Sequence, residues 1–203
     1  MSAPSLLLAT GNQGKVRELR ELLHDLPLPI ITLADLAEKP ALPEETGDTY
    51  EENSVIKAVA IAKATAHLTL ADDSGLEVLC LDNRPGVHSS RYGKDDGTRI
   101  KRLHGELEGR LPAAARFVCV VTIALPSGQS RSFYGECPGQ IINEKRGEGG
   151  FGYDPVFLVD GMDLTMAQLA AEKKNELSHR ARAVFKTVEF IQSVAGREWL
   201  ATS

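Results

Sequence analysis

The stretch SLLLATGNQGK, residues 5–15, changes within a few positions from a run of leucines into a polar turn that ends in a lysine. Residues 5–10 have the pattern of a strand buried on both faces, and the apolar residues between Lys15 and Leu26 recur on one face of a helix. A strand, a glycine turn and a helix in this order are typical of the opening of an α/β fold. Because such a turn offers free backbone N–H groups and the positive end of a helix dipole, it is a candidate anion site, to which Lys15 adds a full charge. A solvent-exposed turn has the same pattern, so this stretch alone leaves both interpretations open.

The rest of the chain alternates strands with helices and then forms a hairpin. Thr49 and Glu52 have the spacing of a capping box, and the helix they begin has an expected buried face of Val55, Ile56, Val59 and Ala62. The last long helix begins near Ser178, and its expected buried stripe is Val184, Phe185, Val188 and Ile191. The other predicted elements are strands at 28–33, 76–81 and 116–125, a strand from His67 that ends in a polar turn at 71–75, a hairpin turn at 126–129 and a helix at 98–107. This order predicts an α/β fold on a mixed sheet.

The composition is that of an ordinary globular protein. The chain has 203 residues, of which 42% are hydrophobic and 25% are charged, and we expect a single domain over residues 1–203. Its formal net charge of −5 argues against a general nucleic-acid-binding protein, which needs a basic face. Cys80, Cys119 and Cys137 have neither zinc nor disulfide spacing. Because no apolar run has the length of a membrane span or the pattern of a signal peptide, we expect a cytoplasmic protein that binds neither membrane nor nucleic acid.

Two glycine motifs match nucleotide-binding fingerprints only in their letters. GEGGFG, residues 147–152, fits G-x-G-x-x-G, but a Rossmann motif needs a strand before it and a helix after it, and residues 153–157 have an extended pattern. The glycine and lysine at 14–15 would end a P-loop, but Ala9 replaces its first glycine and Val16 replaces its hydroxyl residue. The sequence therefore predicts neither a Rossmann dinucleotide site nor a Walker site.

Two acidic pairs are candidate metal ligands and acid–base groups. Asp72 and Asp73 follow a predicted buried strand, and Glu44 and Glu45 lie in an earlier loop. Residues after a strand end of an α/β sheet lie where ligands bind, and neighbouring carboxylates repel each other unless a cation or a proton relieves them. Oxygen ligands without a cluster of His or Cys favour Mg²⁺ over zinc. An Asp-rich turn held by local hydrogen bonds is the alternative interpretation.

Two later segments combine aromatic rings, glycines and cations. GGFGYDP, residues 149–155, places Phe151 and Tyr153 on a glycine-rich loop, an arrangement from which rings stack on a base. KKNELSHR, residues 173–180, places a histidine and an arginine in the first turn of a helix, where cations oppose the helix dipole and favour a functional reason for their presence. Rings buried in a core and a solvated charged face are the alternative interpretations.

In their order along the chain, these motifs resemble those of the inosine/xanthosine triphosphate pyrophosphatase family. The matching motifs run from about Leu6 to Phe190 and are ATGNQGK, EETGDTYEENSVIKA, ADDSGL, RPGVHSSRYG, GEGGFGYDPVF and KNELSHRARA. The resemblance implies an elongated central sheet with flanking helices, two lobes around a nucleotide cleft, and a homodimer. It also implies a hydrolase that cleanses the nucleotide pool. Its Mg²⁺-dependent reaction would convert noncanonical purine nucleoside triphosphates (ITP, dITP and XTP) to the monophosphate and pyrophosphate.

The resemblance also implies a role for each matching residue. Asp73 and Lys15 are the expected catalytic residues, with Asp73 as the general base, and Asp73 and Glu45 are the expected Mg²⁺ ligands. Ser74 is expected to touch the substrate. The residues expected to hold the triphosphate are Thr10, Gly11, Asn12, Gln13, Gly14 and Lys15. The residues expected to enclose the base are Phe151, Gly152, Tyr153, Asp154, Lys174, His179 and Arg180.

One departure from the family pattern bears on this prediction. His88 and Ser90 stand where the family has an aromatic residue and an alanine, which concerns a loop rather than the chemistry.

A regulatory module that holds a nucleotide without cleaving it would keep Lys15 and Phe151 but would not need a carboxylate pair. A phosphotransferase would require an acceptor site, for which the sequence offers no residues. The acidic pairs therefore favour the hydrolase.

Overall fold

The structure is a computed structural model and describes residues 5–202. Its strands are β1 (Leu6–Leu8), β2 (Ile30–Thr32), β3 (Leu68–Val78), β4 (Arg84–Pro85), β5 (Ala113–Ala124), β6 (Ser130–Ile141) and β7 (Phe157–Val159). Its α-helices are α1 (Gln13–Leu22), α2 (Tyr50–Thr65), α3 (Asp96–Glu106), α4 (Ala171–Leu177), α5 (His179–Gln192) and α6 (Val194–Leu200). Short 3₁₀ helices are η1 (Leu33–Asp35), η2 (Leu79–Leu81), η3 (Gly86–Arg91), η4 (Asp154–Val156) and η5 (Met166–Gln168).

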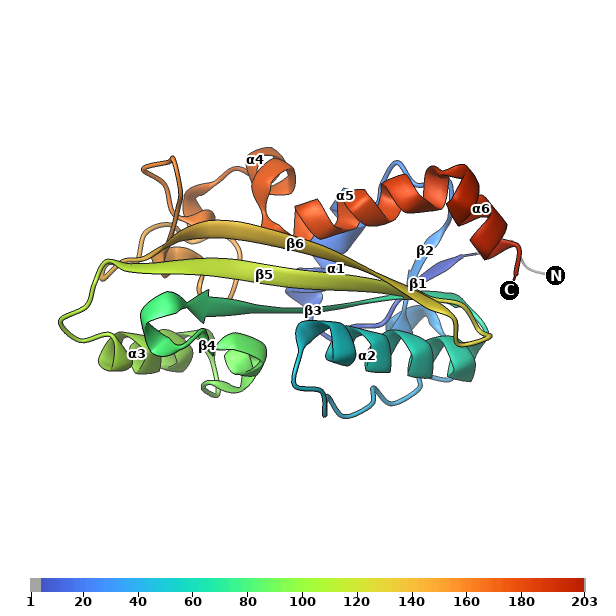
Figure 1. The fold of residues 1–203 in the computed structure, drawn as a ribbon, viewed down its shortest axis with the longest axis horizontal. Helices are drawn as coiled ribbons and strands as arrows, with labels where there is room; N and C mark the ends of the chain where they lie inside the picture. Colours follow the sequence, from blue (N-terminus) through green and yellow to red (C-terminus); the bar gives the residue numbers. More distant parts are fainter. Residues whose placement is uncertain (1–4, 203) are drawn as a thin grey trace. The chain divides into compact units, whose positions relative to one another are not determined.

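Within residues 5–202, seven strands form one sheet in the order β2-β1-β3-β5-β6-β7, with β4 paired to β3 (Figure 1). The sheet is mixed, because β1 is parallel to β2 and β3, whereas β4 and β7 are antiparallel to their partners. The prediction of an α/β fold on a mixed sheet is therefore confirmed. The described chain divides into a first unit (5–73, 119–134 and 180–202) and a second unit (74–118 and 135–179). The single domain over 1–203 stays a prediction, and residues 1–4 and 203 lie outside the described residues.

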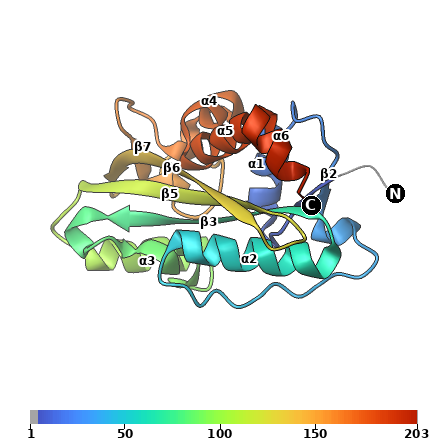
Figure 2. The same cartoon turned by 45° about the vertical axis from the view of Figure 1, so that its right-hand side comes forward.

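In the first unit, helices cover both faces of the sheet. Leu6 and Leu8 of β1 pack into a core with residues of α1, α5 and α6, whereas Leu7 and Ala9 pack into a second core with residues of α2. Because side chains alternate between the faces of a strand, one run of leucines supplies both cores. Figure 2 shows α2 on one side of the strands and α1, α5 and α6 on the other. The prediction of a strand buried on both faces is confirmed.

Helix α2 begins as predicted but buries different residues. Thr49 Oγ1 accepts a hydrogen bond from the Glu52 backbone N–H at 3.1 Å, and the Glu52 carboxylate accepts one from the Thr49 N–H at 3.0 Å, which completes the capping box. The predicted apolar face is wrong in the first turns, where Val55 and Ile56 are only half-buried. The buried residues of these turns include the polar Asn53, Ser54 and Lys57.

Strand β3 runs without a break from Leu68 to Val78, so the predicted turn at 71–75 is wrong. The separate strand predicted at 76–81 is also wrong, because residues 76–78 are the end of β3 and Leu79–Leu81 form η2. Asp72 and Asp73 are both buried within β3. Since successive side chains of a strand point to opposite faces, the two carboxylates enter different surroundings.

The later elements agree with the predictions in type. The turn between β5 and β6 is closed by a hydrogen bond from the Leu125 N–H to the Gln129 carbonyl at 2.9 Å, which confirms the hairpin. Helix α5 follows Ser178 as expected, but Phe185, assigned to its buried stripe, is 47% exposed. Helices α4 and α6 were not predicted. No helix in residues 5–202 combines the length and apolar character that a membrane span needs.

The second unit has its own apolar core. Residues of β3, α3, β5, β6 and β7 meet in it, together with Tyr153 and Met166. Strand β7 pairs antiparallel with β6, with Phe157 opposite Ile141. The glycine loop that precedes η4 is therefore attached to a packed layer of sheet and helix.

Candidate functional site

The polar turn before α1 is held by Asn12, which caps the helix. Asn12 Oδ1 accepts hydrogen bonds from the backbone N–H groups of Gly14 at 2.8 Å and Lys15 at 3.2 Å, and the Asn12 N–H donates to Thr10 Oγ1 at 3.2 Å. The Lys15 Nζ lies 3.0 Å from Oδ2 of Asp72 on β3. The interpretation of this turn as one whose lysine faces water is therefore wrong, because the ammonium group is held against a buried carboxylate.

Asp72 is the shared partner of two cations in the first unit. Its Oδ2 accepts hydrogen bonds from Arg180 Nε at 3.2 Å and Nη2 at 3.1 Å, and Arg180 Nη1 donates to Glu18. Asp72 is 1% exposed, and its Oδ1 has no hydrogen-bond partner among the described residues. Burial alone would raise the pKa of Asp72, but the charges of Lys15, Arg180 and Lys57 outweigh burial and hold this pKa well below its usual value. Asp72 is thus held as an anion.

Asp73 faces a different set of groups, which belong to α2 and the loop before it. Asn53 Nδ2 donates to Asp73 Oδ2 at 3.2 Å, and Lys57 Nζ lies 3.7 Å from Asp73 Oδ1. The same ammonium donates to Glu45 Oε1 at 2.5 Å and to the backbone carbonyl of Asp72 at 2.8 Å. Burial raises the pKa of the Asp73 carboxyl, the negative charges of Glu45 and Asp72 raise it further, and the lysines only partly offset them. Of the two neighbouring carboxylates, Asp73 is therefore the better proton acceptor.

The sequence prediction missed Lys57 and Asn53. They lie four residues apart on α2, so a helix places them on the same face. A buried lysine needs anionic partners, and Lys57 has them in Glu45 and Asp73, which raise its pKa although burial acts in the opposite direction. The signal that would have identified this face is an asparagine and a lysine at this spacing, in a helix that follows an acidic loop.

A metal site made of protein ligands alone is not formed in the part of the chain that the structure describes. Residues 5–202 contain no group of three or more His, Cys, Asp or Glu side chains that could hold a metal ion. Glu45 and Asp73 nevertheless converge, since both lie within 4 Å of the Lys57 ammonium. They supply carboxylate oxygens, which are ligands of hard cations.

In the second unit, Asp154 fixes the glycine loop to helix α4. Its Oδ2 accepts hydrogen bonds from the Phe151 N–H at 3.1 Å and from Lys174 Nζ at 2.7 Å. The Lys174 ammonium also lies 5.6 Å from the centroid of the Phe151 ring. Gly150 has φ +73°, and a Cβ at this position would lie 1.9 Å from Asp154 Oδ2. Only glycine allows the loop to pass this close to the buried pair.

The other loop residues are held from several elements. The Gly152 N–H donates to Asp96 Oδ2 at 2.7 Å, and the Tyr153 hydroxyl donates to the Ser89 carbonyl at 3.1 Å. Tyr153 is buried in the core, so the core interpretation is correct for this ring, whereas Phe151 is half-buried. Ser74 lies half-buried on β3. The imidazole of His179 is buried at the start of α5.

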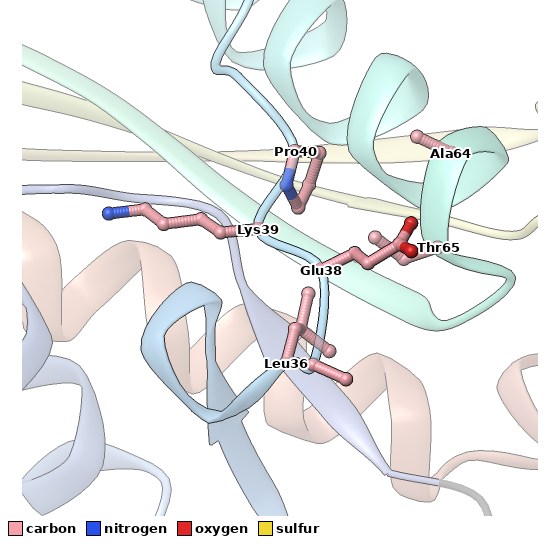
Figure 3. Close-up of a pocket in the computed structure, with 7 residues that line it drawn as sticks. Leu36, Glu38, Lys39, Pro40, Ala64 and Thr65 are labelled. Carbon is pink, nitrogen blue, oxygen red and sulfur yellow. The ribbon is translucent and has the colours of Figure 1, made fainter.

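A cavity of about 280 Å³ lies away from all these residues in the first unit (Figure 3). In Figure 3 the Glu38 side chain extends toward Thr65, and the Lys39 side chain extends the opposite way. The lining residues are Leu36, Ala37, Glu38, Lys39, Pro40, Ala64 and Thr65. None of the predicted site residues is among them.

Comparisons with known proteins place the chain in a family. A sequence model of the Ham1 family matches residues 6–190. The chain belongs to the Ham1 family. It is 45% identical over 186 residues to a protein of Bacillus licheniformis named dITP/XTP pyrophosphatase, a match that covers 89% of this chain and 94% of the relative. A dITP/XTP pyrophosphatase of Bacillus subtilis is 41% identical over 192 residues, which cover 92% of this chain and 96% of the relative. The solved structure of the Ham1 protein of Staphylococcus aureus superposes with a TM-score of 0.82 at 39% identity and covers 93% of this chain and 98% of that one.

In this Ham1 family member the predicted site residues fall into two groups. The first unit contains the turn at 10–15, Glu45, Asp73 and Arg180, and the second unit contains the remaining residues, which are Ser74, Phe151, Gly152, Tyr153, Asp154, Lys174 and His179. Arg180 donates to Asp72 and Glu18, and its expected contact with the base stays a prediction. The catalytic, metal-binding and substrate-binding roles, the homodimer and the cytoplasmic location also stay predictions. His88 and Ser90, which depart from the family pattern, are exposed.

The cysteines of this Ham1 family member differ in their surroundings, and we expect them to differ in reactivity. Cys80 is exposed, and Cys119 and Cys137 are buried. Burial and the nearby Asp72 carboxylate raise the pKa of the Cys119 thiol to about 12. Because the thiolate is the reactive form, the native protein at pH 8 should take up iodoacetamide at Cys80 only, as read by mass spectrometry of the peptides. Labelling of Cys119 at the rate of Cys80 would contradict this placement, and the unfolded protein in urea serves as the control in which all three react.

Proposed function

We propose that this Ham1 family member is a Mg²⁺-dependent dITP/XTP pyrophosphatase, which hydrolyses noncanonical purine nucleoside triphosphates to the monophosphate and pyrophosphate. The observation that carries the proposal is the position of Asp73. It is a buried carboxylate with a raised pKa, held by Asn53 and Lys57 and close to a second carboxylate. Buried ionisable groups with shifted pKa values cluster at catalytic sites, where a general base needs a proton affinity above that of an ordinary carboxylate.

In the proposed reaction, Asp73 accepts a proton from water as the water oxygen attacks the α-phosphorus. The bond from the α-phosphorus to the bridging oxygen breaks, and pyrophosphate leaves with the bonding electrons. Lys15 binds the phosphates and offsets the charge of the leaving group, while Asp72 and the Asn12 cap hold the lysine and its helix in position. Most of the rate enhancement in such a displacement comes from positioning and from charges aimed at the transition state.

The residues near Asp73 fit Mg²⁺. Magnesium takes oxygen ligands, and it commonly binds through one or two carboxylates together with water and substrate phosphates, so a cluster of three protein ligands is not required. Glu45 and Asp73 supply such a pair, and each lies within 4 Å of a cation, the Lys57 ammonium. When bound by these two residues, Mg²⁺ would neutralise negative charge on the phosphate oxygens.

For base recognition, we propose Phe151, Lys174 and His179. The half-buried Phe151 offers a flat face for stacking, and the Lys174 ammonium offers hydrogen-bond donors only. Hypoxanthine and xanthine carry an acceptor oxygen at C6, whereas adenine carries an amino donor there. Adenine would therefore place its amino donor against a donor of Lys174. A site built to bind an acceptor oxygen discriminates strongly against a base that presents a donor at the same position.

Replacing Lys174 tests this recognition. Lys174→Met keeps the aliphatic stem but removes the ammonium, and we expect the ratio of kcat/KM for dITP to that for dATP to fall about tenfold, since a hydrogen bond to a charged donor contributes on the order of 1.5–3 kcal/mol. Steady-state kinetics with both nucleotides measure it. Lys173→Met is the matched control, because Lys173 is half-exposed and pairs with Glu176 on the surface of α4. A ratio that Lys174→Met leaves unchanged would place base selection elsewhere.

A substrate panel with added Mg²⁺ tests the activity itself. We expect kcat/KM for dITP and XTP to exceed that for dATP and dTTP by at least ~10²-fold, which is within the range that buried polar recognition provides. Excess EDTA should abolish turnover. Binding of dITP without any product would favour a regulatory module, and transfer of a phosphoryl group to an added acceptor would favour a phosphotransferase.

A further inference from the structure

Three aromatic rings from distant parts of the chain form a stack in the second unit. Phe157 of β7 lies against Phe117 of β5, with ring centroids 4.3 Å apart and planes inclined by 39°. Phe117 in turn lies against the imidazole of His179, with centroids 4.8 Å apart and planes inclined by only 18°. All three side chains are buried. The histidine ring therefore rests flat on a phenylalanine that is itself packed in the core.

The flat contact determines how the imidazole can present its nitrogens. The bond between Cβ and the ring of a histidine has a broad torsional preference, so the local backbone at the start of α5 does not fix the plane of the ring. A neighbouring aromatic face in offset stacking does fix it. Phe117 covers one face of the imidazole and so fixes the plane of the ring. The ring nitrogens form hydrogen bonds in this plane, so the directions in which they can bond are fixed with it.

We propose that Phe117 is a positioning residue for purine recognition, which sets the plane of the His179 ring and so aims its nitrogen at the edge of a 6-oxopurine base. This inference rests on the proposed function, in which His179 contacts the base. Nothing in the sequence pattern distinguishes Phe117 from the other apolar residues of β5, and its role follows only from the ring that it touches. Phe157 packs against Phe117, and within residues 5–202 its ring contact is with Phe117 and not with His179.

Two substitutions in the same stack separate positioning from packing. Phe117→Leu and Phe157→Leu each remove one buried ring, so both cost stability through a cavity. Only Phe117→Leu removes the face on which His179 lies. We expect Phe117→Leu to raise KM for dITP about tenfold with kcat changed less than ~2-fold, because stacking of one aromatic pair is worth on the order of a tenfold change in an equilibrium. Phe157→Leu should leave KM within ~2-fold of the unaltered protein, and Phe117→Tyr, which keeps the ring, should restore it.

The imidazole itself reports whether the contact with Phe117 exists in solution. In NMR spectra, the ring C–H resonances of His179, assigned with His179→Ala, should shift in Phe117→Leu because the ring current of Phe117 is lost, and should keep their positions in Phe157→Leu. If the two leucine variants shift these resonances equally, or leave both unchanged, the proposal is wrong.

A double variant completes the test. If Phe117 acts through His179, adding Phe117→Leu to His179→Ala should raise KM no further. An additional tenfold rise in the double variant, or a KM for His179→Ala equal to that of the unaltered protein, would overturn the inference. Failure of the proposed function would give a different result, because the unaltered protein would then not hydrolyse dITP. The NMR comparison then still decides whether Phe117 contacts the imidazole.

Discussion

Asp73→Asn should lower kcat for dITP hydrolysis by at least ~10²-fold, the scale on which a positioned general base contributes. Asparagine has nearly the same shape and can still accept the hydrogen bond from Asn53 Nδ2, now 3.2 Å from Asp73 Oδ2. It removes the negative charge and the oxygen that would take the proton from water. Stopped assays of dITP turnover at saturating Mg²⁺ measure the effect, and urea unfolding of the variant shows whether its fold is retained.

Two other carboxylates serve as comparisons for Asp73. Asp163→Asn removes a fully exposed carboxylate and should leave kcat within ~2-fold. Asp72→Asn removes the shared partner of Lys15 and Arg180, so we expect a loss of activity through these cations and not through the proton acceptor. If Asp73→Asn turned over at the rate of the unaltered protein, Asp73 would not be the general base.

Arg180→Met should lower the free energy of unfolding by about 3–5 kcal/mol, the usual result of removing one partner from a buried ion pair. The guanidinium is 2% exposed and donates to Asp72 and Glu18, whose carboxylates are themselves buried. Without it, Asp72 keeps Lys15, but Glu18 loses the cation that the structure places against it. Urea unfolding at pH 7, followed by the fluorescence of the single tryptophan, Trp199, measures the change.

The control for Arg180 is two residues further along the same helix. Arg182 is exposed, so Arg182→Met should change the free energy of unfolding by less than ~0.5 kcal/mol. A loss below 1 kcal/mol for Arg180→Met would mean that its two carboxylate contacts contribute little to the stability of the first unit. This comparison holds whatever the protein hydrolyses.

The parts of the fold that depend on local pattern could be predicted from the sequence. The strand, turn and helix of residues 5–22 follow from a run of leucines, a glycine turn and helical spacing, all within a short stretch. The capping box of Thr49 and Glu52 is likewise a local signal. Helix α6 has such a signal too, because Ser193 caps it through the Gly196 N–H, but its seven residues are too few to show a clear apolar period.

The centre of the site could not be predicted because its structure depends on distant residues. Taken alone, Asp72, Asp73, Ser74 and Gly75 are typical of a turn, yet they lie in the middle of β3. The strand continues because cations neutralise both buried carboxylates: Lys15 and Arg180 beside Asp72, and Lys57 beside Asp73.

The same long-range effect explains the error in α2. A count of apolar residues favours Val55 and Ile56 for its buried face, but the helix turns Asn53 and Lys57 inward. These two residues satisfy the carboxylates of β3 and of the preceding loop. A sequence read for hydrophobic periodicity assigns such a polar face to solvent, although here it is the buried face.

Hydrolysis of dITP in water enriched in ¹⁸O tests the central claim most directly, namely that water attacks the α-phosphorus and pyrophosphate leaves. Phosphorus NMR identifies the products, and mass spectrometry locates the label. We predict one ¹⁸O atom in the deoxyinosine monophosphate and unlabelled pyrophosphate. Release of orthophosphate with a diphosphate intermediate, or label in the pyrophosphate, would contradict the account.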